Sequence, residues 1–437
     1  MPESLDGSAA PFVRRLHALA CWSMVFVPAV VAMPRQRLWD EPSLLASWFG
    51  LSDNANEAVV RFFTASAQVW WLALAAVGVA VVLRRPSARG DRAVWLGSLG
   101  LWSSLMLACL FGTAPGLLPA LAVWPVLLTF LWLGRQDGLQ NALAPLRNAM
   151  RVFCVANIAA VLFVPSWCLE PDFSASIVPG ISWRLHGLSN HANASGPMLG
   201  LGVLVELIAQ PRRGRLVAIV ALCCLLLLTQ SKTSLVALAV AVPIPMLVIL
   251  RDRTGFQLSP ALTFAALAWC LLFALSGVAV VGSLAVHTGH LPEEQLETLT
   301  GRTEIWRIVY DVWRDNPLFG YGPGLFDAGM QSVYQSALGW QVHHAHNQLV
   351  DILGRSGILG VLAWVGFVVL AVWSSVRRPA RLMATAPFVI FMLVSTQSEP
   401  WFTHFTFVER PWLLILLVVL HAEAEKTEVN LPISKSG

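Results

Sequence analysis

Long, uninterrupted apolar runs constrain the fold of this 437-residue chain more than any other feature. Hydrophobic residues make up 56% of the sequence and charged residues 12%, about half the charged share of soluble globular domains. A helix needs about 20 apolar residues to cross the hydrocarbon core of a bilayer. The runs are continuous rather than alternating, which excludes the strands of a membrane barrel. The fold class that we expect is therefore an all-α polytopic membrane protein.

The hydropathy pattern predicts about twelve transmembrane helices. They are expected near Leu16–Met33, Val59–Leu83, Ala93–Phe111, Pro115–Leu133, Val152–Pro165, Ala192–Ala209, Leu216–Thr229, Ser234–Leu250, Pro260–Val286, Gln348–Trp373, Leu382–Ser395 and Pro411–Leu420. The stretch Leu216–Leu250 fits either a broken pair of helices or one long helix. Arg14-Arg15 before the first run resembles a signal peptide, but no A-x-A cleavage site follows, so we expect a retained first helix.

Arginine clusters predict the orientation, because cytoplasmic connections are enriched in Lys and Arg. With both ends of the chain inside, every second connection is short and basic. The predicted organisation is an N-terminal membrane bundle of about nine spans (1–286), an external loop (287–346), C-terminal spans (347–422) and a cytoplasmic tail (423–437). The loop has about sixty residues, which favours a functional or independently structured segment.

An amphipathic helix is predicted inside this loop, over Thr303–Asp315. Ile305, Trp306 and Val309 share one face of it, while Arg307 points elsewhere. Pro317 ends the helix, and the glycine-rich stretch 320–324 that follows predicts turns. Such a helix is typical either of a cavity wall at the membrane surface or of a passive interfacial segment.

The densest polar cluster beside a span is His343-His344-Ala345-His346-Asn347. Histidine titrates near neutral pH and can accept a proton from a hydroxyl group. Asn347 could hold an imidazole tautomer or bind substrate. A metal site would need a third ligand, and the sequence has no DxD or HExxH pattern, so we predict none. The alternative is a water-facing polar cap.

Three cations lie on the same, external side: Arg184, Lys232 and Arg302. Lys232 is flanked by apolar runs, and a cation so close to hydrocarbon is expected to have a partner. Together the three predict an anionic ligand such as a diphosphate, which arginine can bind through two hydrogen bonds. Snorkelling or a surface ion pair is the alternative for Arg184 and Arg302. Glu399, and Glu409 with Arg410, border the last external turn and receive no predicted role.

Four motifs occur in a fixed order: TGRTEIW at Thr300–Trp306, NPLFGYGPG at Asn316–Gly324, HAHNQL at His344–Leu349 and GRSGILG at Gly354–Gly360. This order resembles the shared domain of the family of O-antigen ligases, O-antigen polymerases and bacterial O-oligosaccharyltransferases. The resemblance implies a glycosyltransferase of GT-C-like architecture in the bacterial inner membrane, with its active site facing the periplasm. The implied donor is a glycan on undecaprenyl diphosphate.

The resemblance also implies roles for individual residues. The essential histidine of the family falls on His346 first and His344 second, with Asn347 in support. The diphosphate-binding residues fall on Arg302, on Lys232, where many members have arginine, and on Arg184. The family implies no metal and no cofactor, and no nucleic acid is expected as a partner.

The acceptor that we favour is lipid A–core, which makes the chain an O-antigen ligase acting in lipopolysaccharide synthesis among membrane lipids. An O-antigen polymerase and a protein O-oligosaccharyltransferase remain as alternatives. The external loop has only about sixty residues and we expect no large C-terminal periplasmic domain after it, whereas many protein-glycosylating members have such a domain. A transporter would predict internal repeats and polar helices at mid-membrane, and a non-catalytic scaffold would tolerate loss of the histidines.

Overall fold

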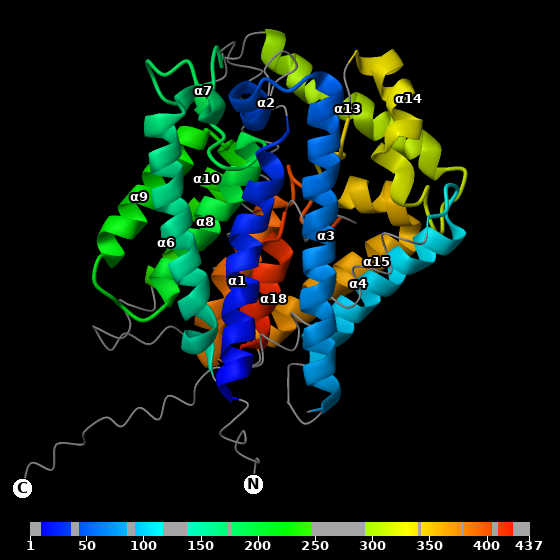
Figure 1. Cartoon of the computed structure of the whole chain (residues 1–437). Coiled ribbons are helices and arrows are strands. Elements are labelled where there is room, and N and C mark those ends of the chain that lie inside the picture. Colours follow the sequence, from blue (N-terminus) through cyan, green and yellow to red (C-terminus); the bar gives the residue numbers. More distant parts are fainter. Residues whose placement is uncertain are drawn as a thin grey trace, which may run out of the picture.

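The computed structural model describes residues 10–35, 43–84, 92–116, 138–173, 176–246, 293–339, 342–376, 379–403 and 410–422. These residues form a predominantly helical bundle (Figure 1). Its longer helices are α1 (Ala10–Ala32), α3 (Asp53–Arg84), α4 (Arg92–Phe111), α6 (Leu139–Phe163), α8 (Ala192–Ile208), α9 (Arg215–Thr229), α10 (Lys232–Ala241), α13 (Glu293–Trp313), α14 (Ala328–Leu338), α15 (Gln348–Val376), α16 (Pro379–Ser395) and α18 (Trp412–His421). Shorter elements are α2 (Leu44–Phe49), α7 (Pro165–Cys168), η1 (Pro323–Phe326), and the antiparallel strands β1 (Leu169–Glu170) and β2 (Arg184–Leu185).

Within the described residues, five helices are long and apolar enough to cross a membrane: α1, α3, α4, α6 and α15. Shorter apolar helices correspond to the predicted spans at α8, α9, α10, α16 and α18. The predicted span Pro260–Val286 lies outside the described residues, as does almost all of Pro115–Leu133. The polytopic helical class is therefore supported, and the count of about twelve spans stays a prediction.

The start of α6 differs from the hydropathy pattern, which also left the continuity of the stretch Leu216–Leu250 open. Helix α6 begins at Leu139, thirteen residues before the predicted start at Val152. Its first turns contain polar residues, and one of them, Arg147, is buried with only 2% of its surface exposed. The stretch Leu216–Leu250 contains a break, because Gln230 adopts a left-handed backbone (φ 53°) between α9 and α10. The broken-pair interpretation is thus the one that the structure supports.

Two short helices, α8 and α18, form the centre of the bundle. All ten residues of α18 are buried, and nearly all of α8 is buried as well. Glycines on α8 permit this close packing. A methyl group on Gly196 would lie 2.7 Å from the Ser231 side chain, and one on Gly200 would lie 2.5 Å from the Phe391 ring. Small residues at such crossings are the usual means of helix association in membranes.

Helix α15 is interrupted at Gly357, whose backbone angles (φ 62°, ψ −161°) are not helical. The amide of Ile358 donates to the carbonyl of Pro317, so the break is bonded to the loop that follows α13. On the other side of the break, Tyr321 N–H donates to the carbonyl of Gly354. A Cβ on Gly357 would lie 2.4 Å from the carbonyl oxygen of Leu318. The glycine motifs therefore join the external segment to α15.

Helix α13 confirms the predicted amphipathic helix, although it begins ten residues earlier, at Glu293. Ile305 and Val309 are buried, whereas Arg307 is exposed and pairs with Glu304. Figure 1 shows α13 and α14 side by side at the upper right of the bundle. The turns predicted at 320–324 are present, with positive φ at Gly320 and Gly322.

Candidate active site

The histidine loop meets the turn that follows α16. Gln348, the first residue of α15, accepts hydrogen bonds from the amides of Trp401 (2.6 Å) and Phe402 (2.8 Å) through its side-chain oxygen. Its own amide donates to the carbonyl of Thr396 at 2.9 Å. These bonds fix the turn that carries Glu399. The carboxylate of Glu399 consequently lies beside the imidazoles of His344 and His346.

Glu399 is the centre of this cluster. Its Oε1 accepts a hydrogen bond from Asn193 Nδ2 at 2.9 Å and lies 3.3 Å from His346 Nδ1. Its Oε2 accepts a hydrogen bond from Arg410 Nη1 at 2.9 Å. Burial raises the pKa of this carboxyl, but His344, Arg410 and His346 outweigh burial and hold the pKa well below its usual range. Glu399 is therefore a buried carboxylate that stays ionised.

His344 has donors facing both ring nitrogens. Arg410 Nη2 lies 2.7 Å from Nε2, and the amide of His346 lies 3.2 Å from Nδ1. Burial, and then the positive charge of Arg410, lower the pKa of His344 well below its ordinary value. A neutral imidazole has one nitrogen that can accept a proton. In His344 each ring nitrogen already faces an N–H group of the protein, so neither is open to a substrate hydroxyl. His344 is thus poorly placed to accept a proton from a substrate.

His346 differs from His344, because only one of its two ring nitrogens contacts a polar group among the described residues. Its side chain is 30% exposed, and its Nδ1 faces the Glu399 carboxylate. A carboxylate at Nδ1 fixes the tautomer that carries the proton there and leaves the Nε2 lone pair available. Nε2 makes no hydrogen bond with a described residue. The backbone of His346 is left-handed (φ 51°), a conformation that costs a non-glycine residue energy and is common at functional sites.

A second cluster, on the 166–191 connection, also places a carboxylate, an arginine and a histidine next to one another. Glu170 and Arg184 are cross-strand neighbours of β1 and β2 and form an ion pair. Arg184 Nη2 lies 3.2 Å from Nε2 of His191, whose Nδ1 accepts the amide of Asn193 at 3.1 Å. Burial raises the pKa of Glu170, but hydrogen bonds from His186 and Arg184 lower it to about 2. Asn193 joins this cluster to Glu399.

The predicted role of Arg184 requires a cation that is free to bind an anion. Its guanidinium is instead paired with Glu170, stacked 4.5 Å from the centre of the Phe173 ring, and largely buried, with 14% of the side chain exposed. An ion pair, the alternative considered for Arg184, is thus present in the structure, with Glu170 as the partner. The diphosphate-binding role of Arg184 stays a prediction.

Arg302 and Lys232 differ from Arg184, because neither forms an ion pair with a described residue. Arg302 lies four residues before Trp306 on α13, so the two share a helix face. Trp306 Nε1 donates to the carbonyl of Ala345 at 2.8 Å, which directs this face toward the histidine loop. Lys232 is exposed in the first turn of α10. The preceding Gln230 bonds the backbone of Trp183 and Ile177, so Lys232 lies at the same end of the bundle as Arg184.

The side chains of His344, His346 and Glu399 could hold a metal ion by their chemistry, since their ligand atoms lie within 4.8 Å of one another. Two imidazoles and one carboxylate are a common zinc ligand set. Arg410, however, bonds both Glu399 and His344. Its guanidinium already supplies the positive charge that a metal would bring to this carboxylate. The local geometry thus disfavours a metal at these three residues.

Residues 217–365 match the family model described as O-antigen ligase. The chain carries the domain of the O-antigen ligase family. The resemblance drawn from the four motifs is confirmed, and ligase- or polymerase-type glycan transfer in the membrane is the general activity that the family supports. No curated protein matches the chain.

The O-antigen ligase match includes Lys232, Arg302, His344 and His346, but ends within α15. Glu399 and Arg410 lie beyond it, and neither received a predicted role. The signal that could have identified Glu399 was its position in a short connection between two apolar runs, on the external side that also carries the histidines. Glu409 lies outside the described residues.

The side chain of Asn347 forms hydrogen bonds with backbone groups in this structure, and its predicted support of the histidine stays a prediction. Its Oδ1 accepts the amides of Leu349 (2.9 Å) and Val350 (3.2 Å), which caps α15, and its Nδ2 donates to the carbonyl of Gln397. The carboxylate of Glu399 takes the place beside His346 that the sequence suggested for Asn347.

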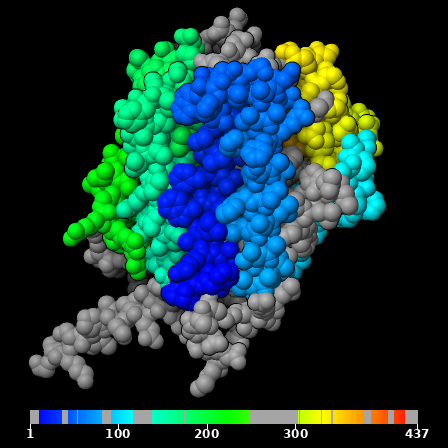
Figure 2. Space-filling model, in the orientation of Figure 1, coloured from blue at the N-terminus to red at the C-terminus, as the bar shows by residue number. Residues whose placement is uncertain are grey.

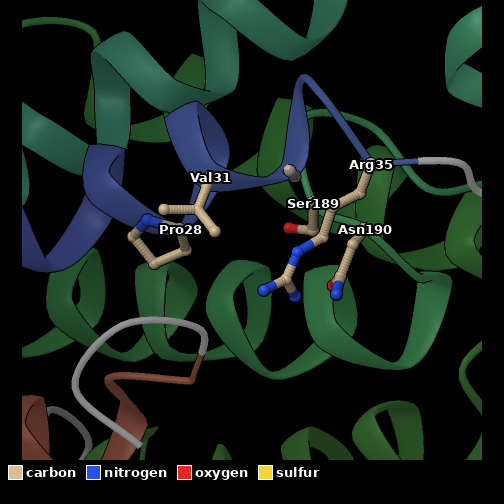
Figure 3. A pocket seen from close by; sticks show the side chains of 6 residues that line it. Pro28, Val31, Arg35, Ser189 and Asn190 are labelled. Carbon is tan, nitrogen blue, oxygen red and sulfur yellow. The ribbon is translucent and has the colours of Figure 1, made fainter. Parts of the chain in front are cut away.

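Two cavities among the described residues lie outside the histidine cluster. The smaller, about 10 Å³, lies where Arg35 reaches past Ser189 toward Asn190 (Figure 3), and it has room for about one water molecule. The larger, about 580 Å³, is a groove between α1, α3 and α6, which lie side by side in Figure 2. Trp22, Phe26, Phe62 and Trp70 contribute to its apolar lining. The larger groove has no ionisable lining residue, so it offers apolar surface and no chemistry.

Proposed function

We propose that this protein is an O-antigen ligase that transfers a glycan from undecaprenyl diphosphate to a hydroxyl group of lipid A–core. The reaction would take place at the periplasmic face of the inner membrane. The observation that carries the proposal is the pairing of His346 Nδ1 with the buried carboxylate of Glu399. This pairing leaves a basic nitrogen at the bundle end that also carries Arg302 and Lys232.

In the proposed reaction, Nε2 of His346 accepts the proton of the acceptor hydroxyl as its oxygen attacks the anomeric carbon of the donor sugar. The bond between that carbon and the diphosphate oxygen breaks, and the electron pair leaves with the diphosphate. Glu399 stabilises the imidazolium that forms, in the way that a buried carboxylate orients a catalytic histidine elsewhere. General base catalysis of this kind contributes about 100- to 10,000-fold.

Arg302 and Lys232 are the residues that we propose to bind the diphosphate. Both are cations without an ion-pair partner among the described residues, so their charge is available to a ligand. They would stabilise the negative charge that grows on the leaving diphosphate. Arg184 would act indirectly, since Glu170 neutralises it and its guanidinium orients His191.

A single displacement at the anomeric carbon inverts its configuration. A retaining mechanism would need a second carboxylate acting as nucleophile about 5 Å from the acid–base residue. Glu399 is held by Asn193 and Arg410 and is 5% exposed, which favours an orienting role over nucleophilic attack. The absence of a DxD pattern and the position of Arg410 support metal-independent transfer.

The experiment that tests the acceptor is reconstitution of the full chain with a polyprenyl-diphosphate glycan and separate candidate acceptors. Labelled glycan should appear on lipid A–core. Label that appears only on a longer polyprenyl-linked glycan would identify a polymerase, and label on a serine-containing pilin would identify a protein-glycosylating enzyme. Either result would overturn the ligase assignment.

The histidine assignment is tested by His346→Ala in the same assay. Transfer should fall by at least about 100-fold, because the base is removed. His343→Ala is the matched control, since His343 lies in the same loop with an exposed side chain, and it should retain activity. Full transfer by the His346 variant would remove His346 from the mechanism.

A further inference from the structure

We propose that the turn between α8 and α9 binds the headgroup of an anionic phospholipid. The turn follows the C-terminal end of α8, whereas Asn193 at the N-terminal end contacts Glu399. A helix of 17 residues spans about 25 Å. The site is therefore separate from the candidate active site, and the proposal does not depend on the function of that site.

Five arginines surround this turn, with one carboxylate between them. They are Arg147, Arg151, Arg212, Arg213 and Arg215. Glu206 is buried and pairs with Arg151, whose Nε and Nη2 donate to its two oxygens at 2.5 and 2.9 Å. Arg212 and Arg213 are exposed and form no ion pair with a described residue. The turn therefore carries several positive charges that Glu206 does not neutralise.

Arg147 gives a second, independent indication of a ligand. It is 2% exposed, and its Nη1 donates to the carbonyl of Gln210 in the turn at 2.8 Å. Its Nε is buried and has no hydrogen-bond partner among the described residues. A buried donor without a partner costs free energy, and Arg147 also lies within the field of Arg212, Arg151 and Arg215, which Glu206 offsets only in part. A phosphate oxygen would relieve both costs.

The residues that follow the arginines provide an apolar face. Leu216 and Val217 are 75% and 73% exposed on α9, directly after Arg215. Val220 continues this face one turn further and is also exposed. Helix α9 forms the outer left edge of the bundle in Figures 1 and 2, which agrees with the exposure of these three side chains. Acyl chains can lie along it while the headgroup contacts the arginines.

Arginines next to an exposed apolar face favour binding of a lipid over binding of a soluble anion. Free phosphate would bind the guanidiniums but gain nothing from Leu216 and Val217. The arginine pattern also predicts that this turn faces the cytoplasm, where anionic lipids attract basic segments.

The proposal is tested with the full chain in detergent, by native mass spectrometry with phosphatidylglycerol and phosphatidylcholine of identical acyl chains. Phosphatidylglycerol should be retained preferentially. The double variant Arg212→Gln, Arg213→Gln should lower this retention by about tenfold or more. The matched control is Arg14→Gln, Arg15→Gln, which removes two exposed adjacent arginines from α1 and should change the retention little.

Four results would overturn the proposal, the last of them displacement of the lipid by inorganic phosphate. The first is equal retention of the two lipids, and the second is unchanged retention in the Arg212, Arg213 variant. The third is binding that appears only after deletion of residues 423–437, which would mean that the acidic tail occupies the arginines. Addition of inorganic phosphate should displace no lipid, and displacement would identify the ligand as a free anion.

Discussion

Oε1 of Glu399 lies 3.3 Å from Nδ1 of His346, across 53 residues of sequence. The histidine comes from a loop inside the region of the family match, and the glutamate from a turn beyond that region. Asn193 on α8 and Arg410 before α18 hold the same carboxylate. The candidate base is thus oriented by residues from three separate parts of the chain.

Glu399→Gln should reduce transfer by roughly 100-fold or more, because an amide can present its N–H to Nδ1 and favour the wrong imidazole tautomer. The measurement is the initial rate of glycan transfer at saturating donor. Glu57→Gln is the control, since Glu57 pairs with Arg61 on an exposed helix surface. A Glu399 variant with the wild-type rate would show that the carboxylate does not orient the base.

Arg302→Gln should lower the transfer rate by roughly 10- to 100-fold, because the leaving diphosphate loses a positive charge. Arg307→Gln, five residues along the same helix, should have little effect. Arg307 is exposed and pairs with Glu304 and Asp311, and exposed pairs contribute little. Equal losses in both variants would indicate damage to α13 rather than loss of a diphosphate contact.

Gly357→Ala should destabilise the protein by more than about 2 kcal/mol, because alanine disfavours positive φ and its Cβ would lie 2.4 Å from the Leu318 carbonyl oxygen. Gly366→Ala on the same helix meets no atom within 4 Å and should be neutral or slightly stabilising. Thermal unfolding in detergent measures both. Similar unfolding temperatures would mean that the break in α15 is not required.

Acid should destabilise the fold from about pH 6.5 downward. Burial, and then Arg184, lower the pKa of His191 to about 3, and burial also lowers that of His344. The unfolded chain therefore binds protons near pH 6.5 that the folded chain does not. Glu170, with its pKa of about 2 against an ordinary value of 4.5, adds a further loss below about pH 4.5.

The measurement is the unfolding temperature between pH 8 and pH 4. His191→Gln should make the decline between pH 6.5 and pH 5 shallower, because one of the groups responsible is gone. His343→Gln, which changes an exposed histidine of the candidate loop, should leave the slope unaltered. An unfolding temperature that does not vary over this range would contradict the neutral state of His191 and His344.

Local patterns in the sequence predicted much of this structure. The apolar runs predicted the positions of most described helices, because a membrane-spanning helix needs about 20 mostly apolar residues in a row. The amphipathic helix was found from the positions of Ile305, Trp306 and Val309, and turns were expected at the glycines 320–324. Each of these inferences uses residues that are close together in the chain.

The local sequence could not predict which charged residues pair with one another. Arg184 looked like a free cation because its partner, Glu170, lies fourteen residues earlier and meets it only across β1 and β2. Glu399 received no predicted role, because the sequence left it either as a partner of an arginine or as a solvated residue. Gln348 and Asn193, which hold that turn and its carboxylate, are distant in sequence. Partners of this kind become visible only when the helices are assembled.

The contact between Arg410 and Glu399 has a consequence for biosynthesis. Chains emerge from the ribosome N-terminus first, so His344 and His346 enter the membrane before Glu399, and Arg410 follows last. A nascent chain that stops before Arg410 would have a carboxylate without its main cationic partner and a misaligned imidazole. Catalytic competence would then arise only when α18, the last described helix, has been inserted, so incomplete chains would remain inert toward lipid-linked sugars.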